Sequence, residues 1–295
     1  MLISENFGEI LEPGLRKVFV DQFKQMTSQL PVLFNMQDSD KAVEHDLEMG
    51  DIADFEQFTG TVSYTDTKQG WKTNYEHQEY VKGIKIQRKL VEDDQYNVIK
   101  RQPQMLATAA FRRRESDGAS VFNNAFNAAV LGGDGLPLCS ASHVNIDSTV
   151  TQSNAGTTAL SPTSVEATRR LMVKFRTNAG NPFQVDPDLL IVPLELEQTA
   201  YEIVNSKGKV DTAQNNVNFH QGKYKVVVWK NWLTSSTRWW MADSVMMKMY
   251  LNWFDRVSTQ FVKDSDFETF VAKYAGYMRY SYGWSDWRFV YGQNA

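Results

Sequence analysis

Alternating apolar and polar residues between Phe58 and Val91 restrict what this chain can fold into. Phe58 and Tyr64 belong to one alternating run, and Ile84 and Ile86 belong to a second run after a long polar segment. A repeat of two residues predicts β-strands, and two such runs predict a hairpin with one apolar face. An isolated two-stranded hairpin is only marginally stable in water. The sequence therefore predicts that this hairpin lies against another surface.

Composition narrows the class of protein. The chain has 295 residues, a hydrophobic content of 42% and a net charge of −4. These values allow a large core and argue against tight binding of nucleic acid or of an anionic membrane. One cysteine excludes an internal disulfide framework, so synthesis in a reducing cytoplasm is expected. The N-terminus lacks a signal-peptide pattern, and the apolar runs are too short to span a bilayer.

The first part of the chain predicts a helical arm. The apolar positions on one face of this helix are Leu15, Val18, Phe19 and Phe23. Pro31 is expected to end the helix, and the acidic residues 35–57 are interpreted as an irregular surface connector. The apolar face of the arm has the same need for cover as the hairpin.

A long helix and a compact unit are predicted farther along the chain. The helix is expected from Pro103 to Leu131, and at 1.5 Å per residue it would be roughly 43 Å long. Residues 161–230 then read as helix, buried strand, helix and strand, which predicts an α/β unit. Residues 244–255 are expected to contain a further strand. Residues 278–291 alternate aromatic with small or charged residues, which predicts a second hairpin.

No group of residues forms the pattern of a known catalytic site. Cys139 and His143 stand four residues apart, but nothing around them resembles a nucleophile signature, so a cysteine hydrolase is kept only as an alternative. The four histidines are scattered and form no zinc-binding pattern, so neither a metal nor another cofactor is expected. A carbohydrate-binding β domain using Trp284 and Trp287 is a further alternative, although a buried aromatic core is the simpler interpretation.

Several segments occur in a characteristic order. They are GLRKVFVDQF, MGDIADFEQFTG, YVKGIKIQRKLVEDDQ, RRRESDGASVFNNAF, GGDGLPLCSASH, DPDLLIVPLELEQTAYEIV and YGWSDWRFVYG. In this order, over nearly the whole chain, they resemble the major capsid proteins of tailed bacteriophages with the Hong Kong 97 phage fold. Within that family the resemblance is greatest to the Mu-like major head subunits. Cys139 departs from the pattern, because a bulkier apolar residue is expected there.

The resemblance implies an α+β fold with four parts. The N-terminal arm would be residues 1–50, the extended hairpin loop 51–91, the peripheral domain with its long spine helix 92–150 and 255–295, and the α/β axial domain 151–254. The loop would lie across the neighbouring subunit through Tyr64, Lys68, Trp71, Lys72, Tyr75, Ile84 and Ile86. The arm would contact a neighbour through Leu15, Val18, Phe19 and Phe23.

The implied function is structural rather than enzymatic. The chain would assemble with copies of itself, as pentamers and hexamers, into an icosahedral shell that encloses double-stranded DNA. Assembly would take place in the bacterial host cytoplasm, with scaffolding and portal proteins and in some cases decoration proteins as partners, and without a membrane. Because Met1 lies close to the arm helix, scaffolding by a separate protein, or none in the mature shell, is expected.

Two details are left open by the resemblance. Arg112, Arg113 and Arg114 form the sharpest basic cluster, but on a helix they point in different directions. A solvated or salt-bridged helix face is the simpler interpretation, and weak, non-specific contact with packaged DNA on the inner surface, or with a neighbouring subunit, is the other. Some relatives also form an isopeptide crosslink from a loop lysine, for which Lys68 and Lys72 are the candidates here.

The main alternative function shares the same fold. An encapsulin-type nanocompartment is also a shell of identical subunits, but it holds enzyme cargo instead of DNA. Purified particles that contain no DNA would favour this alternative.

Overall fold

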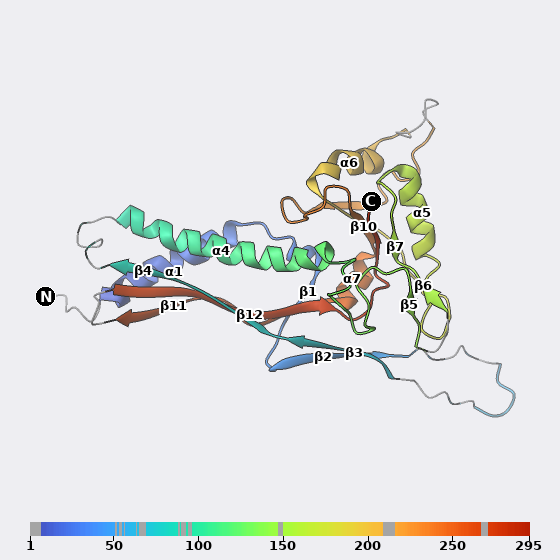
Figure 1. Ribbon diagram of the computed structural model, residues 1–295, viewed down its shortest axis with the longest axis horizontal. Helices are drawn as coiled ribbons and strands as arrows, with labels where there is room; N and C mark the ends of the chain where they lie inside the picture. Colours follow the sequence, from blue (N-terminus) through green and yellow to red (C-terminus); the bar gives the residue numbers. More distant parts are fainter. Residues whose placement is uncertain are drawn as a thin grey trace.

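The structure is a computed structural model. It describes residues 7–50, 52, 55, 57–62, 64, 69–87, 89, 93, 96–146, 150–208, 216–266 and 271–295. Figure 1 shows an elongated layer of long strands and helices, with a unit of short strands at one end and a β-hairpin that leaves the body where the two meet.

Long strands form a four-stranded sheet in the described part of the chain. In sheet order they are β1 (Asn35–Asp38), β11 (Leu251–Asp266), β12 (Val271–Trp284) and β4 (Gln78–Gln87). β1 runs parallel to β11, and the other neighbouring strands are antiparallel. Side chains along β12 are alternately half-buried and buried, because successive residues point to opposite faces of a sheet.

Two helices cover one face of this sheet. They are α1 (Phe7–Gln25) and α4 (Tyr96–Asn123), which lie along the long strands in Figure 1. Buried side chains of both helices and of three strands form one cluster, which includes Leu15, Phe19, Ile86, Leu106, Phe261 and Tyr274. Val81 and Val262 alternate with these buried positions and remain exposed. Around Val81 and Val262 the face opposite the helices is therefore open to solvent.

Short strands form a five-stranded sheet among the described residues. In sheet order they are β7 (Ala155–Gly156), β13 (Val290–Gln293), β10 (Trp239–Ala242), β8 (Leu189–Val192) and β9 (Lys225–Val228). Every residue of β8, β10 and β13 is buried. Helices pack on this sheet, and they are α5 (Pro162–Met172), the short η2 (Leu194–Leu196) and α6 (Glu197–Asn205).

The predicted α/β unit is present with its elements in the expected order. Ser161 caps α5, accepting a hydrogen bond from the backbone N–H of Ser164. The apolar run at 189–192 is a buried strand, and a helix follows it. β13 completes this sheet, although residues 255–295 are expected together in the other domain.

The predicted hairpin between Phe58 and Val91 is wrong in which strands pair. The hairpin that forms pairs β2 (Val43–Met49) with β3 (Gln69–Glu76), whereas residues 57–62 and 64 form no strand as far as they are described. β2 lies in the segment interpreted as a connector, and β3 lies in the expected polar tip. β4 pairs with β12 instead, because the apolar alternation of β4 is buried there between aromatic side chains and α4.

Other boundaries also differ from expectation. α4 begins seven residues before Pro103, continues through it and ends at Asn123, where the Asn123 side chain bonds the backbone of Trp232 and Thr234. Residues 244–250 form helix α7 (Ser244–Tyr250), capped by the Asp243 carboxylate, before β11 begins. A short helix, α2 (Leu30–Leu33), contains Pro31. Two more short strands, β5 (His143–Val144) and β6 (Thr151–Gln152), pair with each other.

The C-terminal aromatic hairpin is also wrong, because its two expected strands join different sheets. β12 pairs with β11 and β4, whereas β13 pairs with β10 and β7. The aromatic side chains in both strands are largely buried. A two-sided core is therefore confirmed, but the predicted pairing within it is not.

Candidate functional site

The β2–β3 hairpin leaves two apolar side chains of β2 in solvent. Along β2 the acidic residues Glu44, Asp46 and Glu48 are half-buried, whereas Leu47 and Met49 are 45% and 68% exposed. A strand that packs on its own chain ordinarily shows the opposite pattern, with apolar side chains inward. The described residues therefore cover Leu47 and Met49 only in part.

Three of the expected loop residues are accessible from outside the chain. Tyr64 is 91% exposed, Trp71 is 37% exposed, and Lys72 is exposed on β3 opposite Leu47. Ile84 is half-buried on β4. Lys68 lies outside the described residues.

Tyr75 and Ile86 are corrections to the expected loop surface. The Tyr75 ring is buried, lies 5.2 Å from the ring of Phe254 and approaches Gly283 so closely that a Cβ there would be 3.0 Å away. Ile86 is fully buried in the cluster beneath α1 and α4. Both side chains are covered by this chain, because β4 and the root of the hairpin belong to the body.

The apolar face of the arm helix is a further correction. Leu15 and Phe19 are buried, and the ring of Phe19 lies 5.4 Å from that of Phe261. Phe23 is half-buried against Phe111 of α4, and Val18 is also half-buried. Leu15, Phe19 and Phe23 therefore pack within the same chain and do not form a free face for a neighbour, whereas the contact expected of Val18 stays a prediction.

The three arginines of the basic cluster have different environments. Arg114 bonds both carboxylate oxygens of Asp255, at 2.7 and 2.8 Å, and it lies over the rings of Trp253 and Tyr280. Arg113 forms an ion pair with Asp117. Arg112 is exposed. Two of the three charges are therefore paired within the chain.

Cys139 and His143 do not form a catalytic pair. Cys139 is buried, and burial raises the pKa of its thiol, which disfavours the nucleophilic thiolate. His143 Nδ1 lies 2.6 Å from Asp134, and its Nε2 lies 3.1 Å from Asn154. The imidazole stacks on Trp287 at 4.2 Å, and both Trp287 and Trp284 are buried. This arrangement opposes both the hydrolase and the carbohydrate-binding alternatives.

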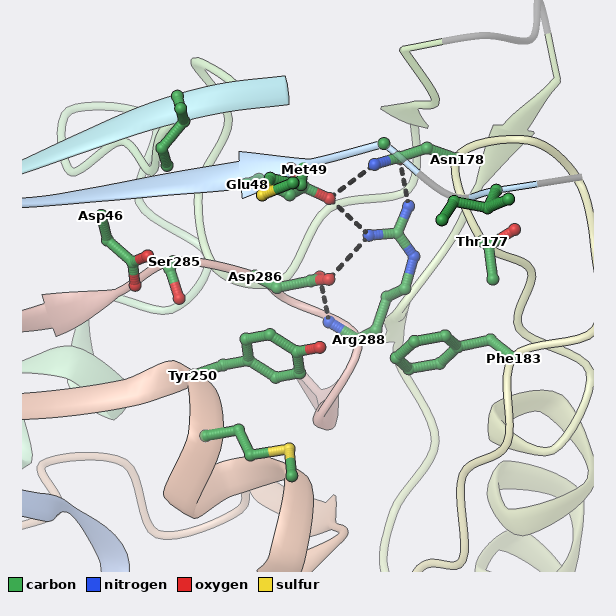
Figure 2. Close-up of a pocket in the computed structure, with 14 residues that line it drawn as sticks. Asp46, Glu48, Met49, Thr177, Asn178, Phe183, Tyr250, Ser285, Asp286 and Arg288 are labelled. Carbon is green, nitrogen blue, oxygen red and sulfur yellow. Dashed lines mark hydrogen bonds and ion pairs between the residues drawn. The ribbon is translucent and has the colours of Figure 1, made fainter. Parts of the chain in front are cut away.

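A polar junction forms where the hairpin meets the body. Arg288 is 3% exposed, and its guanidinium bonds Asp286 at 2.8 Å, Asn178 at 2.7 Å and the carbonyl of Arg176 at 2.9 Å. Its Nη1 is 3.5 Å from Glu48 of β2, and Glu48 also accepts a hydrogen bond of 2.6 Å from Asn178. Figure 2 shows the guanidinium surrounded by these side chains.

The junction lines a cavity of about 580 Å³ between β2 and α7. Met49, Phe183 and Tyr250 contribute apolar surface to it, and Asp46 contributes a further carboxylate. Burial, and then the nearby carboxylate of Asp286, raise the pKa of Glu48. Two carboxylates therefore share one buried guanidinium, and one of them belongs to the hairpin.

Sequence reasoning did not identify this junction. Its signal was the segment YGWSDWRFVYG, in which Asp286 and Arg288 are the two charges among aromatic residues. Buried charges in such a segment need partners, but those partners are distant in sequence.

The described residues contain neither a membrane-spanning helix nor a metal-binding group of side chains. Within the described ranges, no helix combines the length and apolar character needed to cross a membrane. No group of three or more His, Cys, Asp or Glu side chains in this part of the chain is arranged to hold a metal ion.

Comparison with known proteins identifies the fold. The chain resembles the capsid of bacteriophage JBD30, with a TM-score of 0.59 and 13% identity over 69% of this chain and 91% of that one. It also resembles a Mycobacterium phage Patience structure, with a TM-score of 0.56 and 10% identity over 96% and 87% of the two chains. The capsid of an empty GTA particle is similar with a TM-score of 0.55 and 11% identity, over 91% of this chain and 89% of that one. At these identities the likeness concerns the fold alone.

A match to a family model identifies the protein family of the chain. No curated protein matches the chain. The model described as phage capsid protein matches residues 71–292, which include β4, α4 and most of both sheets. With this match over most of its length, the chain belongs to the phage capsid protein family and is a structural major capsid protein.

Proposed function

We propose that copies of this chain assemble, as pentamers and hexamers, into an icosahedral phage head of the Hong Kong 97 type. In this proposal α4 is the spine helix of the peripheral domain, the five-stranded sheet with α5 and α6 forms the axial domain, and the β2–β3 hairpin is the extended loop. The relation to Mu-like heads is part of the same proposal.

The observation that carries the proposal is the reversed polarity of β2. Its carboxylates are directed toward the body, and Leu47 and Met49 are exposed. Phe55 and Phe58, farther along the hairpin, are also exposed. Exposed apolar patches of this kind mark sites of association. The hairpin is therefore suited to lie on another copy of the chain.

The open face of the four-stranded sheet is the receiving surface in this proposal. Val81 and Val262 are exposed there, on strands whose other face is covered by α1 and α4. A hairpin from one copy and an open sheet from the next form a head-to-tail contact, and repeated contacts of that type close into rings. A stable interface typically buries about 1,600 Å², so several contacts for each subunit would stabilise a shell strongly.

The contents and partners of the shell are part of the proposal. With a net charge of −4 and two of the three clustered arginines paired internally, the wall would bind duplex DNA weakly, which suits packing and release. Arg112 is the remaining candidate for contact with DNA. Scaffolding and portal proteins in the bacterial host cytoplasm would assist assembly.

A double substitution on the hairpin tests the proposal. Leu47→Ser with Met49→Ser should leave the subunit folded, because both side chains are exposed, but should abolish shells in negative-stain micrographs and light scattering. The control is Leu131→Ser, which changes an equally exposed leucine in a loop after α4. Normal shells from the double variant would refute the role given to the hairpin.

A further inference from the structure

The hairpin is attached to the body at two separate points. The first is Tyr75, whose ring packs on Phe254 and Gly283 of the four-stranded sheet. The second is Glu48, whose carboxylate bonds Asn178 and lies beside Arg288. Glu44 is paired with Tyr75 across the hairpin, so the two attachments lie four residues apart along β2, or about 13 Å.

Two attachments have a different effect from one. A rod held at one point can swing, whereas a rod held at two points has a fixed direction. The attachments also belong to different parts of the body, because Tyr75 packs on the four-stranded sheet and Asn178 lies in the segment between α5 and β8. Arg288 itself lies between β12 and β13, where the chain passes from one sheet to the other.

The second attachment joins Glu48 of the hairpin to Asn178 and Arg288 of the body, and the shorter bond, of 2.6 Å, comes from Asn178. Arg288 holds Asn178 and the Arg176 carbonyl on one side and Asp286 on the other, with a further bond to Asn145 at 3.2 Å. Residues of the body therefore accept most of the hydrogen bonds that the guanidinium donates. The hairpin adds one further carboxylate, that of Glu48. Removing that carboxylate should therefore detach the hairpin and leave the rest of the junction intact.

We propose that Glu48 is a positioning residue for the hairpin, and that its contacts with Asn178 and Arg288 set the direction in which the hairpin leaves the subunit. β3 also approaches Gly133 through Thr73, Trp71 and the Lys72 backbone, but none of these atoms is charged. The polar junction instead requires defined distances between charged groups. This inference rests on the proposed function only for its consequence, which is that subunits present the hairpin to a neighbour in one orientation before they meet.

Distances between spin labels test the inference directly. Cys139 is buried, so labels attach selectively to cysteines introduced at Lys72, on the hairpin, and at Leu171, on α5. In the unassembled subunit, electron–electron double resonance should give one narrow distance distribution. Glu48→Ala should broaden it on the order of twofold, as expected when a rod loses one of two supports.

Two matched variants separate positioning from stability. Asp255→Ala removes the carboxylate partner of Arg114, another largely buried arginine that lies away from the hairpin, and it should leave the distribution narrow. Glu48→Gln keeps an acceptor for Asn178 and should restore the parent width. An unchanged width in Glu48→Ala, or equal broadening in Asp255→Ala, would overturn the inference.

Assembly provides a separate readout. If Glu48→Ala broadens the distribution and slows shell formation, both the inference and the proposed role of the hairpin are supported. If it broadens the distribution while shells form at the parent rate, Glu48 positions the hairpin, but the hairpin is not the element that drives assembly.

Discussion

The five-stranded sheet and the β2–β3 hairpin bury apolar side chains in opposite ways. Trp239 and Trp240 of β10 are almost wholly buried by other parts of the same chain. Leu47 and Met49 of β2 are exposed, although the neighbouring acidic side chains are half-buried. The first region completes its core within one subunit, whereas the second presents apolar surface to solvent. This difference separates residues that maintain the fold from residues that, in our proposal, serve assembly.

The largest expected effect is in the five-stranded sheet. Trp240→Ala removes a buried ring that lies 5.7 Å from the ring of Phe122, so unfolding should be easier by about 3–5 kcal/mol. Denaturant titration followed by tryptophan fluorescence measures this change. Tyr201→Ala on α6, an exposed position, is the control, and similar losses from both variants would mean that the sheet does not form the stable core.

The next effect concerns the junction between the two regions. Arg288→Ala leaves Glu48 and Asp286 without their shared cation, which should cost about 3–5 kcal/mol of unfolding free energy. Arg112→Ala, at an exposed position, should change the same quantity by less than about 0.5 kcal/mol. Equal effects of the two substitutions in urea denaturation would contradict a buried, charge-balanced junction.

A smaller effect depends on pH at the root of the hairpin. His77 bonds Ser281 at 2.9 Å and Ser39 at 3.2 Å, and its pKa is lowered below 6.5 by burial and by Arg279, with Arg256 adding to and Glu44 opposing the shift. The unfolded chain therefore takes up a proton first as the pH falls through 6.5, and stability is lost below that value.

His77→Gln removes this titration. The unfolding free energy of the parent should decline between pH 7 and 5 by about 1 kcal/mol more than that of the variant. Parallel urea titrations of the two proteins across this range measure the difference. Curves that run parallel would show that His77 is not buried as the structure places it.

The smallest effect has the opposite sign. The raised pKa of Glu48 means that the folded chain takes up a proton more readily than the unfolded chain, so this residue lowers stability at neutral pH. The deficit should disappear as the pH falls through the raised pKa toward 4.5. Glu48→Gln should therefore be as stable as the parent at pH 7, or more stable by about 1 kcal/mol or less. A marked loss at pH 7, measured by thermal unfolding, would indicate that the ionised form is the stabilising one.

The two regions also differ in how well the sequence predicts them. Strand β8 is recognisable from four successive apolar residues, and α5 from Ser161 and Pro162 at its start, because these signals are local. The hairpin register is not local. β4 pairs with β12, and Ile84 of β4 lies opposite Tyr274 of β12. The alternating pattern of one strand does not reveal which distant strand will pair with it.

The same reasoning explains the errors at the candidate surfaces. Leu15, Phe19 and Ile86 form an apolar pattern that fits equally well on a neighbour or on the chain itself, and the structure places them on the chain itself. The junction was missed because Glu48 and Arg288 lie 240 residues apart, so no short motif contains both. Burial of a charged pair becomes apparent only when the two sheets are brought together.

The order of strands has a consequence for biosynthesis. β13 is the last strand along the chain, yet it lies between β7 and β10 in the interior of its sheet. While the ribosome is still translating, both neighbours lack their hydrogen-bonding partner, so this sheet cannot close until residues 290–293 have emerged. Chains that stop short of β13 would consequently be unable to complete the sheet, and they would not form a subunit competent to join a growing particle.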